Sequence, residues 1–301
     1  MNKPAHKTTS ATSTSAAVAV SDEEKKHLAV EEHHSTGQLV TTNNVAAVEH
    51  NAWDAYADQG YEETTANDLA RNFVYVLQAL SPPVRQRRMM EGNLWITGVD
   101  IEIDREIGLN FIPVYSQQRY IEWVPRDSGG GFVAVHMPGD PEVVKAISEG
   151  SFGKYHTDKG NDLVQTFHLF AIAELLPNVW RPICFPITST KIKKYNGLRS
   201  QLDLLRLPSG RPYPLFAHVC KATTIFEKKS GQEYYNIVFG LAHKSAEESR
   251  LKIGSTEFNL ARELYQFCHT GSVNLDYSST IDDSQFAGTD SSEGDSSDVA
   301  F

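Results

Sequence analysis

Cysteine is scarce in this sequence. The 301 residues contain three cysteines, Cys184, Cys220 and Cys268, and their odd number and wide spacing argue against the disulfide framework of a secreted domain. No apolar run reaches the roughly 18–20 residues that a membrane span requires. The first residues do not follow the basic, apolar and small order of a secretory signal. We therefore expect a protein of the reduced cytoplasm that does not contact a membrane.

Motifs of catalysis and cofactor binding are also lacking. The Gly-Lys pair at 153–154 has neither the spacing nor the hydroxyl of a phosphate-binding loop. No cysteine or histidine pair has zinc-site spacing. Asp100, Glu102 and Asp104 alternate as carboxylates of metal-dependent nucleases can, but isoleucines alternate with them, which is typical of a half-exposed strand. We expect a protein that is not an enzyme and needs no metal or nucleotide cofactor.

Charge is present in quantity but is unevenly distributed. The net charge is −10, yet residues 282–301 hold six acids and no base, and residues 1–50 hold six acids and four bases. Residues 51–281 are therefore nearly neutral. We predict a disordered N-terminal arm over 1–50, a folded domain over 51–278 and a disordered acidic tail over 279–301, because the two ends have few large apolar side chains to bury.

Hydrophobic periodicity predicts both strands and helices in the folded domain. Helical spacing covers 65–80, 189–207 and 255–270, with Ser189 and Ser255 at the starts of the last two. Alternating or short apolar patterns predict strands within 93–136 and over 163–172 and 179–187. Two further strands, 214–226 and 234–241, flank a basic turn at 228–231. This order predicts an α+β, mainly β domain built on an antiparallel, barrel-like sheet.

The densest positive charge lies between residues 181 and 229, which contain ten bases and two acids. Aromatic residues are interleaved with these bases. Single-stranded nucleic acid is bound by such a combination, because cations follow the phosphates and aromatic faces stack on unpaired bases, worth roughly 1–3 kcal/mol per base. The alternative is that the aromatics are core residues and the lysines a solvated surface. The predicted DNA-binding residues are Trp180, Lys191, Lys193, Lys194, Arg199, Arg211, Tyr213, Lys221, Lys228, Lys229 and Tyr234.

The acidic tail ends in a phenylalanine. An acidic arm can compete with DNA for a basic surface, and a terminal aromatic residue can enter a pocket on a partner protein. The alternative is a solubilising tail, although that role does not require an apolar last residue. We predict that Asp295, Asp298 and Phe301 bind a partner.

Residues 177–301 resemble the single-stranded DNA-binding proteins of bacteria and tailed phages. The likeness rests on Lys221–Phe239, which reads as a strand, a basic turn and a strand, and on Ser279–Phe301 as the acidic tail ending in phenylalanine. It implies an elaborated OB-fold-like antiparallel barrel with peripheral helices and disordered N- and C-terminal arms. It also implies that the tail recruits replication or recombination proteins such as a polymerase, primase or recombinase.

The middle of the chain is also similar to an uncharacterised group of tailed-phage proteins. The segments that carry this likeness are Leu77–Pro82, Arg119–Arg126 with Gly129–Val133, and Pro186–Lys191. Members resemble replication or recombination accessory proteins, and some have been called structural. The region 65–176 exceeds a minimal OB domain, so we expect an elaborated barrel or a second lobe.

Three functional hypotheses follow. The first is a non-catalytic protein that coats single-stranded DNA in the host cytoplasm during phage replication, recombination or repair, with self-association left open. The alternative is a virion or scaffold protein whose basic stretch is an assembly surface. A third is a divalent-metal nuclease that uses Asp100, Glu102 and Asp104.

Overall fold

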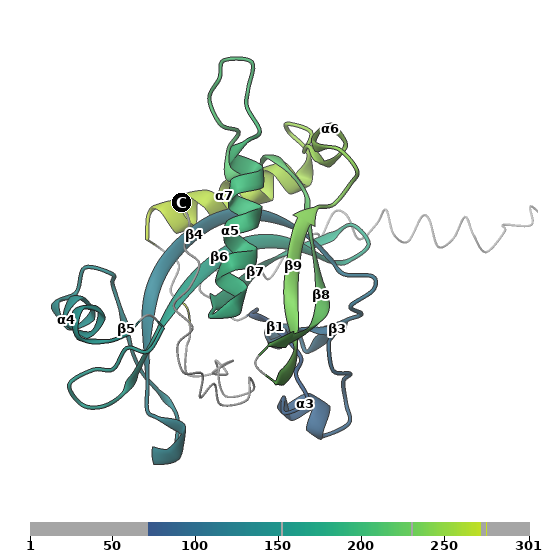
Figure 1. Cartoon of the computed structure of the whole chain (residues 1–301). Coiled ribbons are helices and arrows are strands. Elements are labelled where there is room, and N and C mark those ends of the chain that lie inside the picture. The colour runs from purple at the N-terminus through teal and green to yellow at the C-terminus, as the bar shows by residue number, and fades with distance from the viewer. Residues whose placement is uncertain (1–71, 152, 230, 272–274, 276–301) are drawn as a thin grey trace, which may run out of the picture. The chain divides into compact units, whose positions relative to one another are not determined.

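The computed structural model describes residues 72–151, 153–229, 231–271 and 275 (Figure 1). All described residues belong to one compact unit. The predicted arm boundaries at 50 and 279 lie outside them. The elements are β1 (Val74–Val76), α3 (Pro82–Arg85), β2 (Leu94–Ile96), η1 (Thr97–Val99), β3 (Ile101–Ile103), β4 (Leu109–Trp123), η2 (Arg126–Ser128), β5 (Phe132–His136), α4 (Pro141–Glu149), β6 (Asp162–Leu176), β7 (Val179–Thr188), α5 (Thr190–Asp203), η3 (Leu215–Ala217), β8 (Cys220–Lys229), β9 (Gln232–Leu241), α6 (Ala246–Ser249) and α7 (Thr256–His269).

The larger sheet has the strand order β7-β6-β4-β8-β9, with β5 paired to β4 beside this path. All its pairings are antiparallel. Without β5, the five main strands stand in the order 3-2-1-4-5, and α5 lies between the third and the fourth along the chain. An OB-fold is likewise built from five main strands in a partly open barrel. The predicted mainly β, antiparallel fold with helices around it is thus confirmed.

The sheet is not a closed barrel, because no pairing joins its two end strands, β7 and β9, within the described residues. The side chains of these strands meet in the interior instead. Phe185 of β7 and Phe239 of β9 have ring centroids 5.5 Å apart, and Phe111 of β4 lies 5.0 and 5.7 Å from them. Edge-to-face aromatic contacts of this kind add roughly 0.5–1.5 kcal/mol each to the burial free energy. The three rings therefore hold the curved sheet around one core.

Strand β1 bridges the opening between β7 and β9. It belongs to a three-stranded sheet, β1-β2-β3. At one end, the Cys184 amide of β7 donates to the Asn72 carbonyl at 2.9 Å. At the other, the buried Gln78 side chain bonds both backbone groups of Tyr235 in β9, its amide donating at 2.7 Å and its carbonyl accepting at 3.0 Å. Residues 72–78 thus connect β7 to β9, which in a closed barrel would pair directly with each other.

Helices α5 and α7 pack on the sheet as the apolar spacing predicts (Figure 1). Tyr195, Leu198 and Leu202 of α5 enter the main core, and α5 contacts both β7 and β9. Helix α7 covers β4 and β6 through a second core that includes Ala261 and Leu264. The Ser255 side chain accepts from the Phe258 amide and is the N-cap of α7.

The predicted helix over 65–80 is wrong in its described part. Residues Val74–Val76 form β1, and the chain turns before α3. Phe73 and Tyr75 enter the second core, whereas Val74 and Val76 enter the main core. A strand with both faces buried lacks polar alternation, so its apolar residues also fit helical spacing.

Between β4 and β6 the chain makes a long excursion, residues 124–161, which contains β5 and α4. Gly129, Gly130 and Gly131 all have positive φ angles in the turn before β5, a conformation that glycine adopts readily. A small core cluster of Tyr120, Val143, Ala146, Tyr155 and Leu163 supports it.

Phe239→Ala is predicted to lower the free energy of unfolding by about 3–5 kcal/mol, because it removes a ring shared by β4, β7 and β9. Phe226→Ala deletes the same group from a ring that is 54 % exposed and is expected to cost far less. Urea denaturation of both variants tests this difference. Equal losses would contradict the role given to the interior rings.

Candidate nucleic-acid interface

The predicted basic residues fall on two neighbouring parts of the molecule. Helix α5 carries Lys191, Lys193, Lys194 and Arg199, and Arg211 lies in the loop that follows it. Strand β8 carries the other three, Lys221, Lys228 and Lys229. Lys193, Arg199, Arg211, Lys228 and Lys229 are exposed, whereas Lys191, Lys194 and Lys221 are half-buried.

The β8–β9 hairpin brings two lysines and an aromatic ring to one end of the sheet. Lys228 pairs with Glu233 and Lys229 with Gln232 in the strand register. The Lys228–Glu233 ion pair measures 2.8 Å but is well exposed, so it is weak and a phosphate can displace it. Phe226 lies two residues before Lys228, hence on the same face of β8, and is 54 % exposed. The hairpin thus offers both groups that a single strand needs.

A polar network fixes α5 to this hairpin. Lys194 Nζ lies 2.6 Å from Glu227 Oε1, while Asn236 and Tyr234 donate to Oε2 of the same carboxylate at 2.7 and 3.3 Å. Burial raises the pKa of Glu227, but Lys194 and Asn236 together outweigh it and lower the pKa overall. The main role of Lys194 and Tyr234 in this structure is therefore to position the basic helix α5 against the hairpin.

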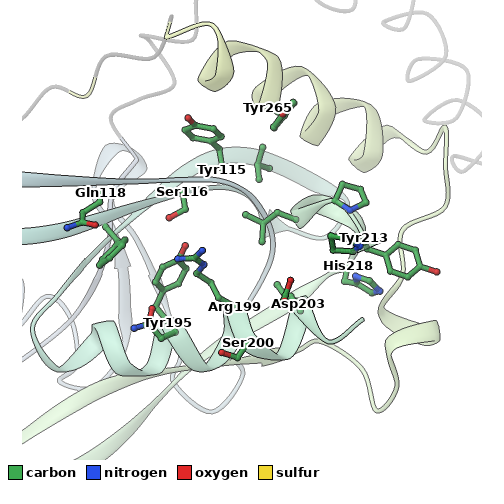
Figure 2. A pocket seen from close by; sticks show the side chains of 17 residues that line it. Tyr115, Ser116, Gln118, Tyr195, Arg199, Ser200, Asp203, Tyr213, His218 and Tyr265 are labelled. Carbon is green, nitrogen blue, oxygen red and sulfur yellow. The ribbon is translucent and has the colours of Figure 1, made fainter. Parts of the chain in front are cut away.

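A cleft of about 850 Å³ lies between α5, β4, α7 and the loop before η3 (Figure 2). It brings together two predicted residues, Arg199 and Tyr213. The Arg199 guanidinium lies 5.8 Å from the centroid of the Tyr195 ring. The sequence analysis missed several of its other lining residues, among them Tyr115, Ser116, Phe167, His218 and Tyr265.

Two buried polar atoms in the cleft lack hydrogen-bond partners among the described residues. They are Tyr195 Oη and His218 Nε2, on side chains that are each 1 % exposed. The Ser116 hydroxyl faces the Tyr195 phenol (Figure 2) and favours its ionised form slightly, but outside hydrogen-bond geometry. An unmatched buried polar group costs roughly 1–3 kcal/mol, so these two atoms lower the stability of the fold beside the cleft.

The protonation states of these groups follow from their burial. Burial is the main cause that lowers the pKa of His218, and the nearby Arg250 guanidinium lowers it further, so the imidazole is neutral at pH 7. Burial raises the pKa of Tyr195, so its phenol keeps its proton. The cleft therefore presents a phenol, a neutral imidazole and one guanidinium between aromatic walls, a setting that suits a planar polar ring.

The remaining predicted aromatics differ in exposure. Trp180 is 9 % exposed and packs in the second core, so its ring face is not available for stacking. Tyr213 is half-buried, lies edge-on to His218 at 5.3 Å and carries the Arg250 guanidinium over its ring at 5.0 Å. Asp295, Asp298 and Phe301 lie outside the described residues.

The three carboxylates of the nuclease hypothesis, Asp100, Glu102 and Asp104, each accept hydrogen bonds from nearby residues. Asp100 accepts from Arg88 and Trp95, and Glu102 accepts from the Met90 amide and Asn93. Asp104 accepts from the Glu106 amide two residues away. These contacts shape the β1-β2-β3 sheet and its turns, as the half-exposed strand interpretation expects.

Comparison with known proteins gives one match. The model of a protein family described as Pam3 phage gp34-like protein covers residues 40–274. The chain belongs to this family. This phage family agrees with the resemblance of the middle segments to tailed-phage proteins. No curated protein and no solved structure matches the chain. No described helix is long and apolar enough to span a membrane.

Glu227→Gln tests the network that joins α5 to the hairpin. Because the pKa of Glu227 is lowered by folding from its ordinary value of 4.5, its stabilising effect is present above that pH and disappears as the pH falls through the lowered pKa. The variant is expected to be about 1 kcal/mol less stable at pH 7, and this difference should shrink as the pH falls below 4.5 and through the lowered pKa. Glu263→Gln, on the exposed side of α7, is the matched control in pH-dependent urea denaturation. A loss independent of pH would contradict the network.

Proposed function

We propose that this phage protein binds single-stranded DNA without catalysis, as an accessory factor in replication or recombination. The observation that carries the proposal is the position of the basic hairpin in the strand order. The β8–β9 turn, with Lys228 and Lys229, corresponds to the loop between the fourth and fifth strands of an OB-fold. OB-folds bind oligonucleotides through that loop, the loop between strands 1 and 2 and the adjoining sheet face.

The two groups of basic residues supply different parts of the interaction. The hairpin lysines and the exposed Lys193 of α5 give sequence-independent phosphate contacts. The exposed Phe226 offers a stacking face beside them. In the cleft, Arg199 and the tyrosine walls receive an unstacked base. A duplex keeps its bases stacked and paired, so this cleft favours a single strand.

The acidic tail is assigned two roles in the proposal. Its six acids and absence of bases oppose the positive charge of residues 181–229 and would compete with DNA for the basic surface. Phe301, with Asp295 and Asp298, would bind a replication or recombination protein. DNA binding and partner binding would then be coupled, because DNA releases the tail.

The charge variant K228A/K229A tests the phosphate contacts. For single strands, the logarithm of the binding constant falls with the logarithm of salt concentration by roughly 0.7 per phosphate contact. Loss of two contacts should weaken binding of an oligo-dT and reduce this slope by about 1.4. The matched control K244A/K252A removes two exposed lysines that lie after β9 and should leave both quantities unchanged. Fluorescence anisotropy over a salt series provides the measurement.

Two results would count against the interface. Equal slopes in both double variants would remove the hairpin from it. Absence of DNA binding by the wild type at low salt, together with copurification with phage particles, would favour the virion or scaffold role instead.

Deletion of residues 279–301 should tighten oligo-dT binding, most clearly at low salt, because it removes six acids that compete with the phosphates. Phe301→Ala keeps the charge and should leave DNA affinity unchanged while it abolishes partner binding. Unchanged or weaker DNA binding by the truncated chain would refute the competition.

A further inference from the structure

The excursion between β4 and β6 contains a group of side chains that the proposed function does not use. Glu122 near the end of β4, His136 at the end of β5 and Glu142 in the first turn of α4 place one ligand atom each within 4.8 Å of one another. The three residues come from three different elements, 14 and 6 positions apart. Such spacing matches no sequence motif for metal binding, so only the fold brings them together.

Hydrogen bonds orient the Glu122 carboxylate as they orient carboxylates that bind a metal ion. Its carboxylate is nearly fully buried, and Oε1 accepts from Asn161 at 2.7 Å and from Thr157 at 3.3 Å. These bonds leave Oε2 directed toward His136 Nε2 at 2.9 Å. Ligating carboxylates are commonly oriented in this way by outer hydrogen bonds to their second oxygen.

The distances are within reach of a single ion. Ligand atoms about 2.0–2.1 Å from a common ion can lie no more than about 4.2 Å apart. His136 Nε2 and Glu122 Oε2 already meet this limit, and the half-buried Glu142 needs only a small side-chain rotation to do so. At their separation the two atoms would subtend about 90° at the ion, which leaves further coordination positions for water.

The donor set selects the class of ion. One imidazole nitrogen and two carboxylate oxygens suit zinc, manganese or iron, whereas magnesium and calcium prefer oxygen ligands alone. The described apolar core of the excursion is also small: it is the five-residue cluster around Tyr120 and Val143, while Val144 is 54 % exposed and Val135 38 % exposed. Small substructures with thin cores are commonly stabilised by a metal ion.

From these observations we infer that Glu122, His136 and Glu142 form a binding site for a divalent transition-metal ion, with zinc as the reference ion, which fastens α4 to β4 and β5. Asn161 and Thr157 are positioning residues that act through Glu122. The site is independent of the hairpin and the cleft.

Zinc titration of the full, chelator-treated chain tests the site by calorimetry and by thermal unfolding. Glu142→Gln is the main variant, because the half-buried Glu142 side chain has no hydrogen bond or ion pair among the described residues, so the fold does not depend on its charge. Glu149→Gln removes an exposed carboxylate from the other end of the same helix and is the matched control. The other histidines of the chain are unchanged in both variants, so any zinc that they bind is the same in all three proteins.

The wild type and Glu149→Gln are expected to bind one zinc ion with a shared affinity and to unfold at a higher temperature with zinc than without it. Glu142→Gln should bind at this site at least tenfold more weakly and lose the thermal shift. Cobalt gives a second readout, since a protein-bound ion with nitrogen and oxygen ligands has a visible absorption band that Glu142→Gln should lose. Equal zinc affinity and equal cobalt spectra in the two variants, or no binding by the wild type, would overturn the site.

Discussion

The contact of Phe111, Phe185 and Phe239 is the interaction on which the rest of the structure depends. The rings come from the first, third and fifth main strands, and the outer two belong to the end strands of the sheet. Since no backbone pairing joins those ends among the described residues, side-chain packing has to hold the curvature. An open sheet with unsatisfied edges is also prone to pair with other chains, and here β1 occupies the opening through backbone bonds to β7 and the Gln78 bonds to β9.

This arrangement determines where functional groups can lie. Because α5 packs against both β7 and β9, its inner face is committed to the core, and its basic residues point elsewhere. Lys194 joins the helix to Glu227 on the hairpin, whereas Arg199 reaches the cleft on the side of β4 and α7. The hairpin and the cleft are thus both joined to α5, which under the proposed function would present phosphate contacts and a base pocket to one strand of DNA. The excursion between β4 and β6 adds the acidic and histidine residues inferred to bind a metal ion.

The sequence predicts those elements whose two faces differ or whose turns have distinctive chemistry. Strand alternation over 163–172, the helical stripe around Tyr195 and the helix that begins at Ser255 all correspond to observed elements. The sequence wrongly predicts a helix over Phe73–Val76 because both faces of this strand are buried, each in a different core. Trp180 illustrates a different limit: composition places an aromatic among bases, but only packing decides that the ring is covered.

The sequence predicts the positive charge of the candidate nucleic-acid interface but not the shape of its cleft. Lysines near a hairpin turn can be read directly from the sequence, as Lys228 and Lys229 were. The cleft joins residues from β4 to α7, about 150 positions apart, and its unmatched Tyr195 and His218 atoms arise from that packing alone. The metal ligands likewise meet only when α4 folds back beside β5.

The central claim is that this phage family member binds single-stranded DNA. The most direct test is competition, in which the full chain is bound to a labelled oligo-dT and displaced by unlabelled single strand or by matched duplex at two salt concentrations. The account predicts displacement by the single strand at much lower concentration than by the duplex, with weaker binding at the higher salt. Equal displacement by both competitors, or no binding of the oligo-dT at low salt, would contradict it.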